Sequence, residues 1–262
     1  MTRHSTIALP GLLLCFRAAA QRPTPEEQQR TLDAARDTAV HYSSKLPDFI
    51  CTEQVERTNA IVPNLRVTTD RLTIQLTYFG QTEKQKLVAI NGNPTTDPLS
   101  SLEGLITGGE FGSLQLGVFD TSSSADFKWK EATNLRQRPA TIYTYRVARA
   151  RSHYMLGARG PDGKMAAAPA GYRGEVVLDN QTNRVLRLTA QADDIPKESD
   201  IVLSTVEVDY DFVDVAGREH LLPSRSDSRM QRTNRRIGNV VTFTGYHKFE
   251  ADSTIDFGTP KK

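Results

Sequence analysis

The sequence predicts a mainly β protein, of the α+β kind, built from long antiparallel strands that are each buried on one side. The first observation is the segment 206–212, in which apolar and acidic residues alternate without interruption. Successive side chains of a strand point to opposite faces of a sheet, so one face of this strand is apolar and the other is lined with carboxylates. The second observation is that the same two-residue period recurs along most of the chain, which is typical of antiparallel sheets with one buried face.

The first 20 residues have the pattern of a secretory signal peptide. Arg3 gives a basic start, residues 7–16 form a short apolar run, and residues 18–20 are alanines suited to cleavage after Ala20. The apolar run is far shorter than the roughly 20 residues of a membrane span, so we expect no transmembrane segment. The alternative is a cytosolic N-terminal helix. A cleaved signal predicts a periplasmic or secreted protein, with residues 21–262 forming a single β-rich domain.

The charge balance and the cysteine content limit which functions the sequence supports. The chain has 33 Lys and Arg against 31 Asp and Glu, and residues 1–20 contain two arginines and no acid. The mature chain is therefore neutral, 31 against 31, and we expect no nucleic-acid partner. Cys15 leaves with the signal peptide, so Cys51 has no cysteine partner and is expected to be a small buried hydrophobe.

A helix is expected to open the mature chain. Thr24 suits the N-cap, Pro25 the first helical position, and Glu27 completes a capping box. The helix must end before Pro47. Its apolar residues fall on one stripe at helical spacing: Leu32, Ala35, Ala39 and Tyr42.

Strands account for most of the remaining chain. Alternation and turn signals place them at 51–59, 71–78, 84–90, 127–130, 138–148, 153–156, 174–179, 184–189, 206–212, 220–229, 239–249 and 253–257. The segment 94–120 breaks the pattern and is expected to hold one or two short helices that dock on the apolar face. The segment 157–171, rich in Gly, Pro and Ala, is expected to be a loop.

No catalytic or metal-binding motif stands out. The five histidines form no metal-ligand pattern, and the chain has neither a nucleophile elbow nor a phosphate loop. His220 beside Glu219 would form an acid–base pair only with a third group brought in by folding. We therefore expect no enzyme activity, no cofactor and no metal; a hydrolase is the weakest of the alternatives.

Two charged features have structural interpretations. Glu207, Asp209 and Asp211 are expected to form cross-strand ion pairs with Arg184 and Arg187 rather than a calcium site, because a strand spaces its carboxylates too regularly for a compact cage. The arginines near 232–236 form a basic hairpin tip, which is either solvated or a contact for an acidic partner or lipid phosphate.

The predicted apolar face is the candidate ligand-binding surface. It is an ordinary core under the helices or a partly open cavity for a hydrophobic ligand, and the sequence leaves both open. Its residues are Leu72, Ile74, Leu76, Val176, Leu178, Val206, Val208, Tyr210, Phe212, Val241 and Phe243.

Two stretches resemble a known superfamily. The segments 174–188 and 210–223, with their strand–Asp–turn–strand pattern, are similar to the periplasmic half-barrel proteins that include lipoprotein carriers and anti-sigma regulators, the LolA/RseB-like superfamily; the segment 46–51 looks like uncharacterised secreted bacterial proteins. The resemblance implies a strongly curved antiparallel half-barrel sheet, with the N-terminal helix and short inserted helices on the concave face.

The function expected from this resemblance is non-enzymatic binding of a lipid or lipoprotein acyl chain in the concave face. The alternative is a cell-envelope module that binds or senses a partner protein, through the sheet edge or the basic tip, without a small-molecule ligand. A cavity lined by the apolar residues favours the carrier, and a filled core with an exposed edge favours the module.

Overall fold

The computed structural model describes residues 22–62, 66–102, 108–159, 165–197 and 199–249. The expected signal peptide, residues 1–20, and the expected strand 253–257 lie outside the described residues.

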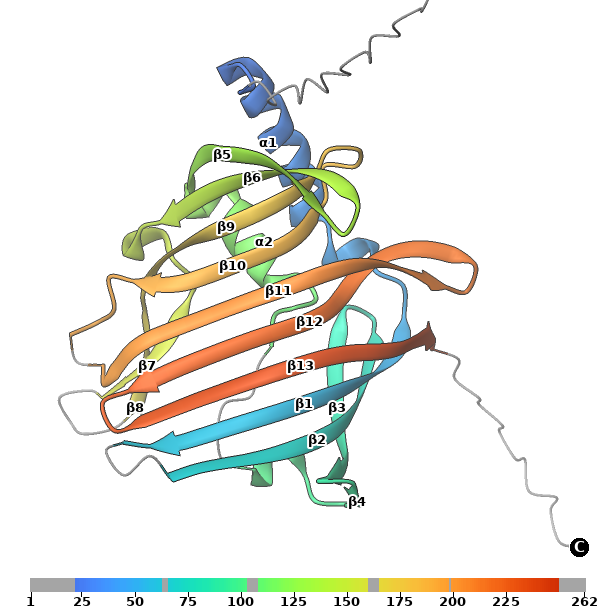
Figure 1. Ribbon diagram of the computed structural model, residues 1–262, viewed down its shortest axis with the longest axis vertical. Helices are drawn as coiled ribbons and strands as arrows, with labels where there is room; N and C mark the ends of the chain where they lie inside the picture. Colours follow the sequence, from blue (N-terminus) through green and yellow to red (C-terminus); the bar gives the residue numbers. More distant parts are fainter. Residues whose placement is uncertain (1–21, 63–65, 103–107, 160–164, 198, 250–262) are drawn as a thin grey trace, which may run out of the picture.

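One large antiparallel sheet dominates the molecule (Figure 1). Its eleven strands run in the order β4-β3-β2-β1-β13-β12-β11-β10-β9-β6-β5, and the two ends of this order are not joined into a barrel. The strands are β1 Phe49–Ile61, β2 Arg66–Phe79, β3 Thr82–Ile90, β4 Asn93–Pro94, β5 Asp126–Leu135, β6 Arg138–Val147, β9 Gly171–Asp179, β10 Val185–Asp193, β11 Ile201–Val215, β12 Arg218–Arg232 and β13 Arg235–Lys248. The mainly β, half-barrel prediction is confirmed.

Strands from opposite ends of the chain meet in the middle of this sheet. β1 pairs with β13 in antiparallel register, with Val55 opposite Val241. The two-residue period determines which side chains face inward: in β2, Leu72, Ile74, Leu76 and Tyr78 are all buried. A shift of one residue would expose that whole set, so burial fixes the register.

Two α-helices lie on one side of the sheet, behind it in the view of Figure 1. α1 (Pro25–Val40) begins with the expected capping box, in which the Thr24 hydroxyl accepts from the Glu27 amide and the Glu27 carboxylate accepts from the Thr24 amide. Its expected stripe is buried against the sheet. The short helices of the 94–120 insertion are also confirmed: η2 (Leu99–Ser101) and α2 (Ser113–Phe119). The remaining short helices are η1 Ser43–Lys45, η3 Thr121–Ser123 and η4 Arg149–Arg151.

The segment 153–171 differs from the expectation. β7 (Met155–Arg159) and β8 (Met165–Pro169) pair with each other in a separate two-stranded sheet, so 153–156 does not continue the main sheet and 157–171 is not simply a loop. Alanine and glycine have weak β propensity, which hides this hairpin in the sequence. The hairpin is held by burial of Leu156 against Ala170, Ala192 and Ile201.

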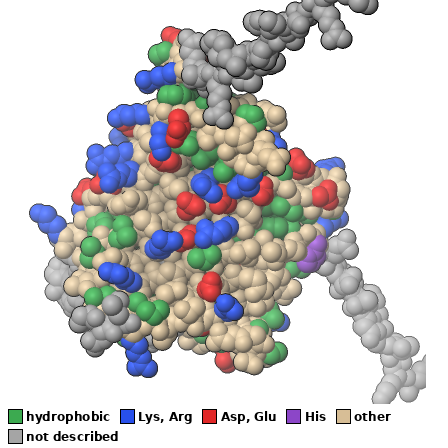
Figure 2. Space-filling view, viewed as in Figure 1, with side chains coloured by type: hydrophobic (Ala, Val, Ile, Leu, Met, Phe, Trp, Pro, Cys, Tyr) green, Lys and Arg blue, Asp and Glu red, His purple; other side chains and the backbone are tan. Residues whose placement is uncertain are grey.

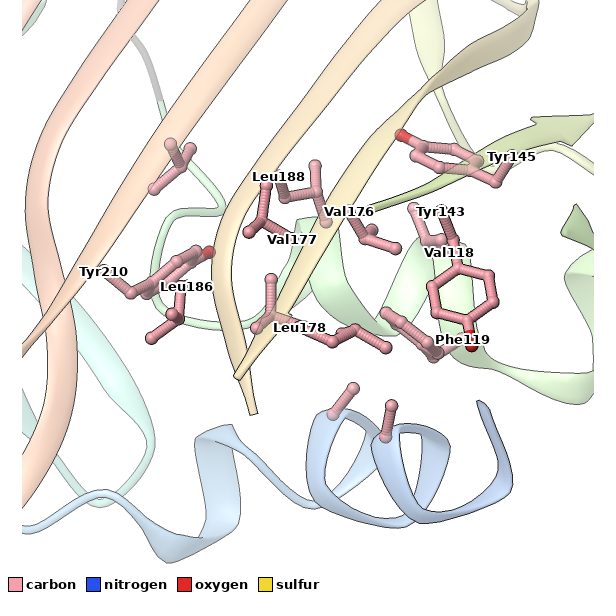
Figure 3. Packing of buried hydrophobic residues seen from close by; sticks show 14 of the residues in the cluster. Val118, Phe119, Tyr143, Tyr145, Val176, Val177, Leu178, Leu186, Leu188 and Tyr210 are labelled. Atoms are coloured by element: carbon pink, nitrogen blue, oxygen red, sulfur yellow. The ribbon is translucent and has the colours of Figure 1, made fainter. Parts of the chain in front are cut away.

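The core under the sheet consists of two main clusters. One lies between β5–β6–β9–β10–β11 and both helices, where Leu178, Phe119 and Tyr143 pack over α1 (Figure 3). The other lies under β1, β2, β3 and β13 and includes an aromatic group in which Phe49 stacks on Tyr78 with ring centroids 5.1 Å apart. We call the covered side of the sheet the inner face and the other side the outer face.

Candidate ligand-binding site

The predicted apolar residues line the inner face, but in two groups. Leu72, Ile74, Leu76, Val241 and Phe243 belong to the β1–β3 cluster, and the other six to the α1–α2 cluster. Nine of the eleven are buried, and Val206 and Phe212 are half-buried. The Phe212 ring lies under the Arg138 guanidinium, 4.3 Å from its centroid. Side chains of the described residues therefore fill much of this face.

A cavity of about 140 Å³ remains on the inner face between α2 and the sheet. The sheet contributes Tyr172, Leu188 and Ala190, none of which is among the eleven predicted residues. The opposite wall comes from α2 and the residues before it and is small or apolar: Gly108, Gly109, Ser113, Leu114, Gly117 and Val118, with His153 and Tyr154 at the side. Leu188 pairs with both Val176 and Val208, so the cavity adjoins the predicted surface.

The α2 segment, residues 110–119, is held over the sheet by a few hydrogen bonds to its backbone. The Tyr172 hydroxyl donates to the Gly117 carbonyl at 2.6 Å, and the Tyr210 hydroxyl donates to the Glu110 carbonyl at 3.0 Å. Ser43 donates to the Phe111 carbonyl at 2.8 Å. The N-cap, Gly112, has no side chain to cap the helix. A helix of this length is not stable by itself, so packing and these contacts keep it in place.

A carboxyl group is buried in the second cluster. Glu53 of β1 is only 4% exposed and accepts hydrogen bonds from the Gln85 amide at 2.9 and 3.2 Å. Burial raises the pKa of Glu53 to about 7, although the Gln85 hydrogen bond opposes this effect. This side of the inner face therefore holds a buried titratable group, and the nearby carboxyl groups of Glu110 and Glu83 add to the rise in its pKa.

His220 and Glu219 line a different pocket, of about 210 Å³, between the end of α1 and the tips of two hairpins. Lys45 and Arg184 lie at the same pocket. Its two hydroxyl groups are already engaged, because Tyr42 donates to the Leu221 carbonyl and Thr38 to the Ala35 carbonyl. Among the lining residues, then, His220 has no serine or cysteine nucleophile to activate.

The outer face carries the charged side chains, which gather across its strands in Figure 2. The expected cross-strand ion pairs are present: Arg187 binds both carboxylate oxygens of Asp209, at 2.8 and 3.0 Å. The second partner of Asp209 is Arg136, from the β5–β6 turn, and Arg184 takes no part. Burial by itself would raise the pKa of Asp209, but the arginine hydrogen bonds outweigh it and lower the pKa below its ordinary value.

The basic hairpin tip is largely engaged within the protein. Arg232 binds Asp200 with a nitrogen–oxygen distance of 2.7 Å, and Arg235 donates to the Asn59 side-chain oxygen at 2.7 Å. Arg236 is exposed. A lipid or acidic partner would therefore meet one accessible arginine more readily than a cluster of three.

Other chemistry has little support in the described part of the chain. Cys51 is a buried free cysteine, and burial raises its pKa to about 12, which suppresses the thiolate. The described residues contain no group of three or more His, Cys, Asp or Glu side chains arranged to hold a metal. Within them, no helix has the length and apolar character needed to cross a membrane.

Comparison with known proteins finds matches in structure only. No protein-family model matches the chain, and no curated protein does. Solved structures that match include a putative outer membrane lipoprotein-sorting protein domain from Vibrio parahaemolyticus, at 14% identity and TM-score 0.41, covering 86% of this chain and 94% of that one. A LolA superfamily protein from Nitrosomonas europaea matches at 10% identity and TM-score 0.35, with 85% and 93% covered.

A third match is the Mycobacterium tuberculosis lipoprotein LppX, at 8% identity and TM-score 0.30, covering 83% of this chain and 95% of that one. One of these structures is described as a LolA superfamily protein, the superfamily that segments 174–188 and 210–223 resemble. All three TM-scores are below 0.5, so the function has to be argued from the residues of this chain.

Proposed function

We propose that this protein is a non-enzymatic carrier that binds a hydrophobic ligand, a lipid or lipoprotein acyl chain, between the inner face of the sheet and the α2 segment. The observation that carries the proposal is the cavity lined by Tyr172, Leu188 and Ala190, which lies directly under the short, uncapped α2. An apolar chain placed there would gain about 0.8 kcal/mol for each CH₂ group that it buries.

The cavity as it stands is too small for a long acyl chain, since sites for drug-sized ligands measure roughly 300–1,000 Å³. Binding therefore requires the α2 segment to move away from the sheet. The movement would break the contacts of Tyr172, Tyr210 and Ser43 with its backbone. These are few, and each is worth only about 0.5–1.5 kcal/mol net, so burial of several CH₂ groups would offset their loss.

The location that fits this role is the periplasm or the extracellular space, as the signal-like residues 1–20 predict. The six predicted apolar residues of the α1–α2 cluster would be the second layer of the site, buried or half-buried now and reached by the ligand as α2 lifts. The five in the β1–β3 cluster would extend the apolar surface beyond it.

Competition with a fluorescent fatty-acid analogue tests the proposal. Ala190→Leu places extra carbon atoms in the cavity, and we expect it to weaken binding at least about tenfold while the melting temperature is maintained. Gln191→Leu, which adds a similar apolar side chain at the next, exposed position of β10, is the matched control and should bind like wild type. Equal binding by both variants would place the ligand elsewhere, and no binding by wild type would contradict the carrier.

One observation favours the alternative, a module that binds a partner protein of the cell envelope. A groove of about 400 Å³ on the outer face is lined by the apolar side chains of Val67, Leu203 and Val240, beside Arg236. Val67 is largely exposed, which suits an apolar segment of a partner. A protein that binds no amphiphile would leave this groove as the better candidate site.

A further inference from the structure

The pocket near His220 combines an apolar interior with a charged rim. Tyr42, Val185 and Leu221 are buried in its wall, and Leu46 is half-buried. Lys45, Arg184 and Glu219 are exposed, and His220 is half-buried. At about 210 Å³ the pocket is smaller than a typical drug site, so it suits a small ligand or one end of a longer one.

The rim is cationic. Lys45 and Arg184 form no ion pair within the described residues, and one acid, Glu219, lies with them. Glu219 also interacts electrostatically with Arg138, which lies outside the pocket, so its negative charge neutralises the rim only in part. His220 stays neutral near pH 7, because burial, Arg184 and Arg218 lower its pKa, with Asp214 opposing them. The pocket residues thus carry a net single positive charge, two cations against one anion.

The interior holds a hydrogen-bond donor without an acceptor. Gln115 of α2 lines the pocket and is 2% exposed, and its Nε2 makes no hydrogen bond. The Gln115 side chain interacts with the Tyr210 hydroxyl, which donates to the Glu110 carbonyl and whose oxygen is still able to accept, but Nε2 and that oxygen do not have hydrogen-bonding geometry. A buried donor without a hydrogen bond destabilises the protein, so an oxygen atom brought in by a ligand would be stabilised here.

We propose that this pocket binds the acidic head group of an anionic single-chain amphiphile, with the acid between Lys45 and Arg184 and one of its oxygens accepting from Gln115 Nε2. This inference rests on the proposed carrier function and specifies its ligand class. Gln115 and the cavity residue Val118 are three positions apart on α2 and so lie on the same side of that helix, which places both pockets within reach of one ligand. On the sheet, Val185 and Ala190 line the two pockets and are separated by five residues of β10, roughly 17 Å.

The head group is a carboxylate or a phosphate monoester, since both present oxygens to Arg and Lys in the same way. Four probes with the same ten-carbon chain separate these cases: decanoate, decyl phosphate, decanol and decyltrimethylammonium. Titration calorimetry of the protein purified from expression of its full sequence would give a dissociation constant for each.

We expect wild type to prefer the two anions over decanol and to bind decyltrimethylammonium worst. The double variant Lys45→Met, Arg184→Gln should weaken binding of the preferred anion at least about tenfold and leave decanol unchanged. Gln115→Leu should weaken binding of the same anion while leaving the charges of Lys45 and Arg184 at the rim unchanged. Lys128→Met, which removes an exposed cation of β5 that does not line this pocket, is the control and should have no effect. The tighter anion identifies the head group.

A second readout is independent of affinity. An anion between Lys45 and Arg184 would raise the pKa of His220, which NMR titration of the histidine ring would detect. Equal affinity for decanoate and decanol, unchanged in the double variant, would overturn the head-group site and leave the carrier intact. Failure of all four probes to bind would overturn the carrier and this inference together.

Discussion

Single ionisable residues on the two faces of the sheet have opposite effects on stability. Asp209, 6% exposed, is held ionised by Arg187 and Arg136, so its contribution is present at neutral pH and is lost as pH falls through its lowered pKa. Burial instead favours the neutral form of Glu53 and raises its pKa to about 7. Its raised pKa favours the folded state below the ordinary range for a glutamate, and this contribution is lost as pH rises toward about 7.

Replacing Glu53 should therefore stabilise the protein at high pH. Glu53→Gln removes the buried charge and retains a group able to hydrogen bond with Gln85. A shift from 4.5 to about 7 corresponds to about 3 kcal/mol at pH 8, so we expect the variant to unfold at a higher urea concentration there and to match wild type near pH 4. Urea unfolding monitored by circular dichroism at the two pH values measures this difference.

The matched control is Glu56→Gln, three residues further along β1 on the exposed side, where the contact with Arg71 is a surface pair. Its effect should stay within about 1 kcal/mol at both pH values. A loss of stability in Glu53→Gln at pH 8 would contradict the prediction, because it would mean that the ionised carboxylate stabilises the folded protein.

At the scale of elements, alternation and capping predict most of the structure. The capping box of α1 and the buried set of β2 follow directly from local sequence, because both depend on spacing within a single element. The β7–β8 hairpin does not, since its strands contain alanine and glycine and gain their stability from Leu156, Ala170 and Ile201 in a separate small core. Arg136 likewise reaches Asp209 from a turn distant in sequence.

α2 is a short helix without a side-chain cap, and its position against Ser43 depends on Gly112. Gly112 has a φ of +130°, and a Cβ atom there would lie 1.9 Å from Ser43 Oγ. Gly112→Ala would strain the backbone and displace Ser43 from the Phe111 carbonyl, so we expect a loss of about 2–4 kcal/mol and faster hydrogen exchange in residues 110–119. Hydrogen-exchange mass spectrometry measures this change.

Gly80→Ala is the control for backbone strain alone. Gly80 has a φ of +55° in the β2–β3 turn, and a Cβ there would meet nothing within 4 Å. It should cost about 1 kcal/mol and leave exchange in the α2 segment unchanged. Similar losses of stability in both variants, with no faster hydrogen exchange near α2, would contradict the view that Gly112 holds this segment in place.

At the scale of the whole molecule, the sequence predicts the apolar face but not the cavity on it. Periodicity identifies which side chains point inward, as for Leu178 and Val208. It does not show where a gap remains, because the gap arises where Gly117 of α2 meets Tyr172 and Ala190 of the sheet. The Gln115 pocket depends in the same way on α1, α2 and two hairpins meeting in space.

Native mass spectrometry of the protein, expressed from its full sequence and purified without detergent, tests the carrier most directly. Solvent extraction of the same sample would identify anything bound. The account predicts a co-purifying amphiphile at near-stoichiometric amount, or stoichiometric uptake of added fatty acid by the apo protein. A clean apo mass, with no uptake of fatty acid or phospholipid, would contradict it.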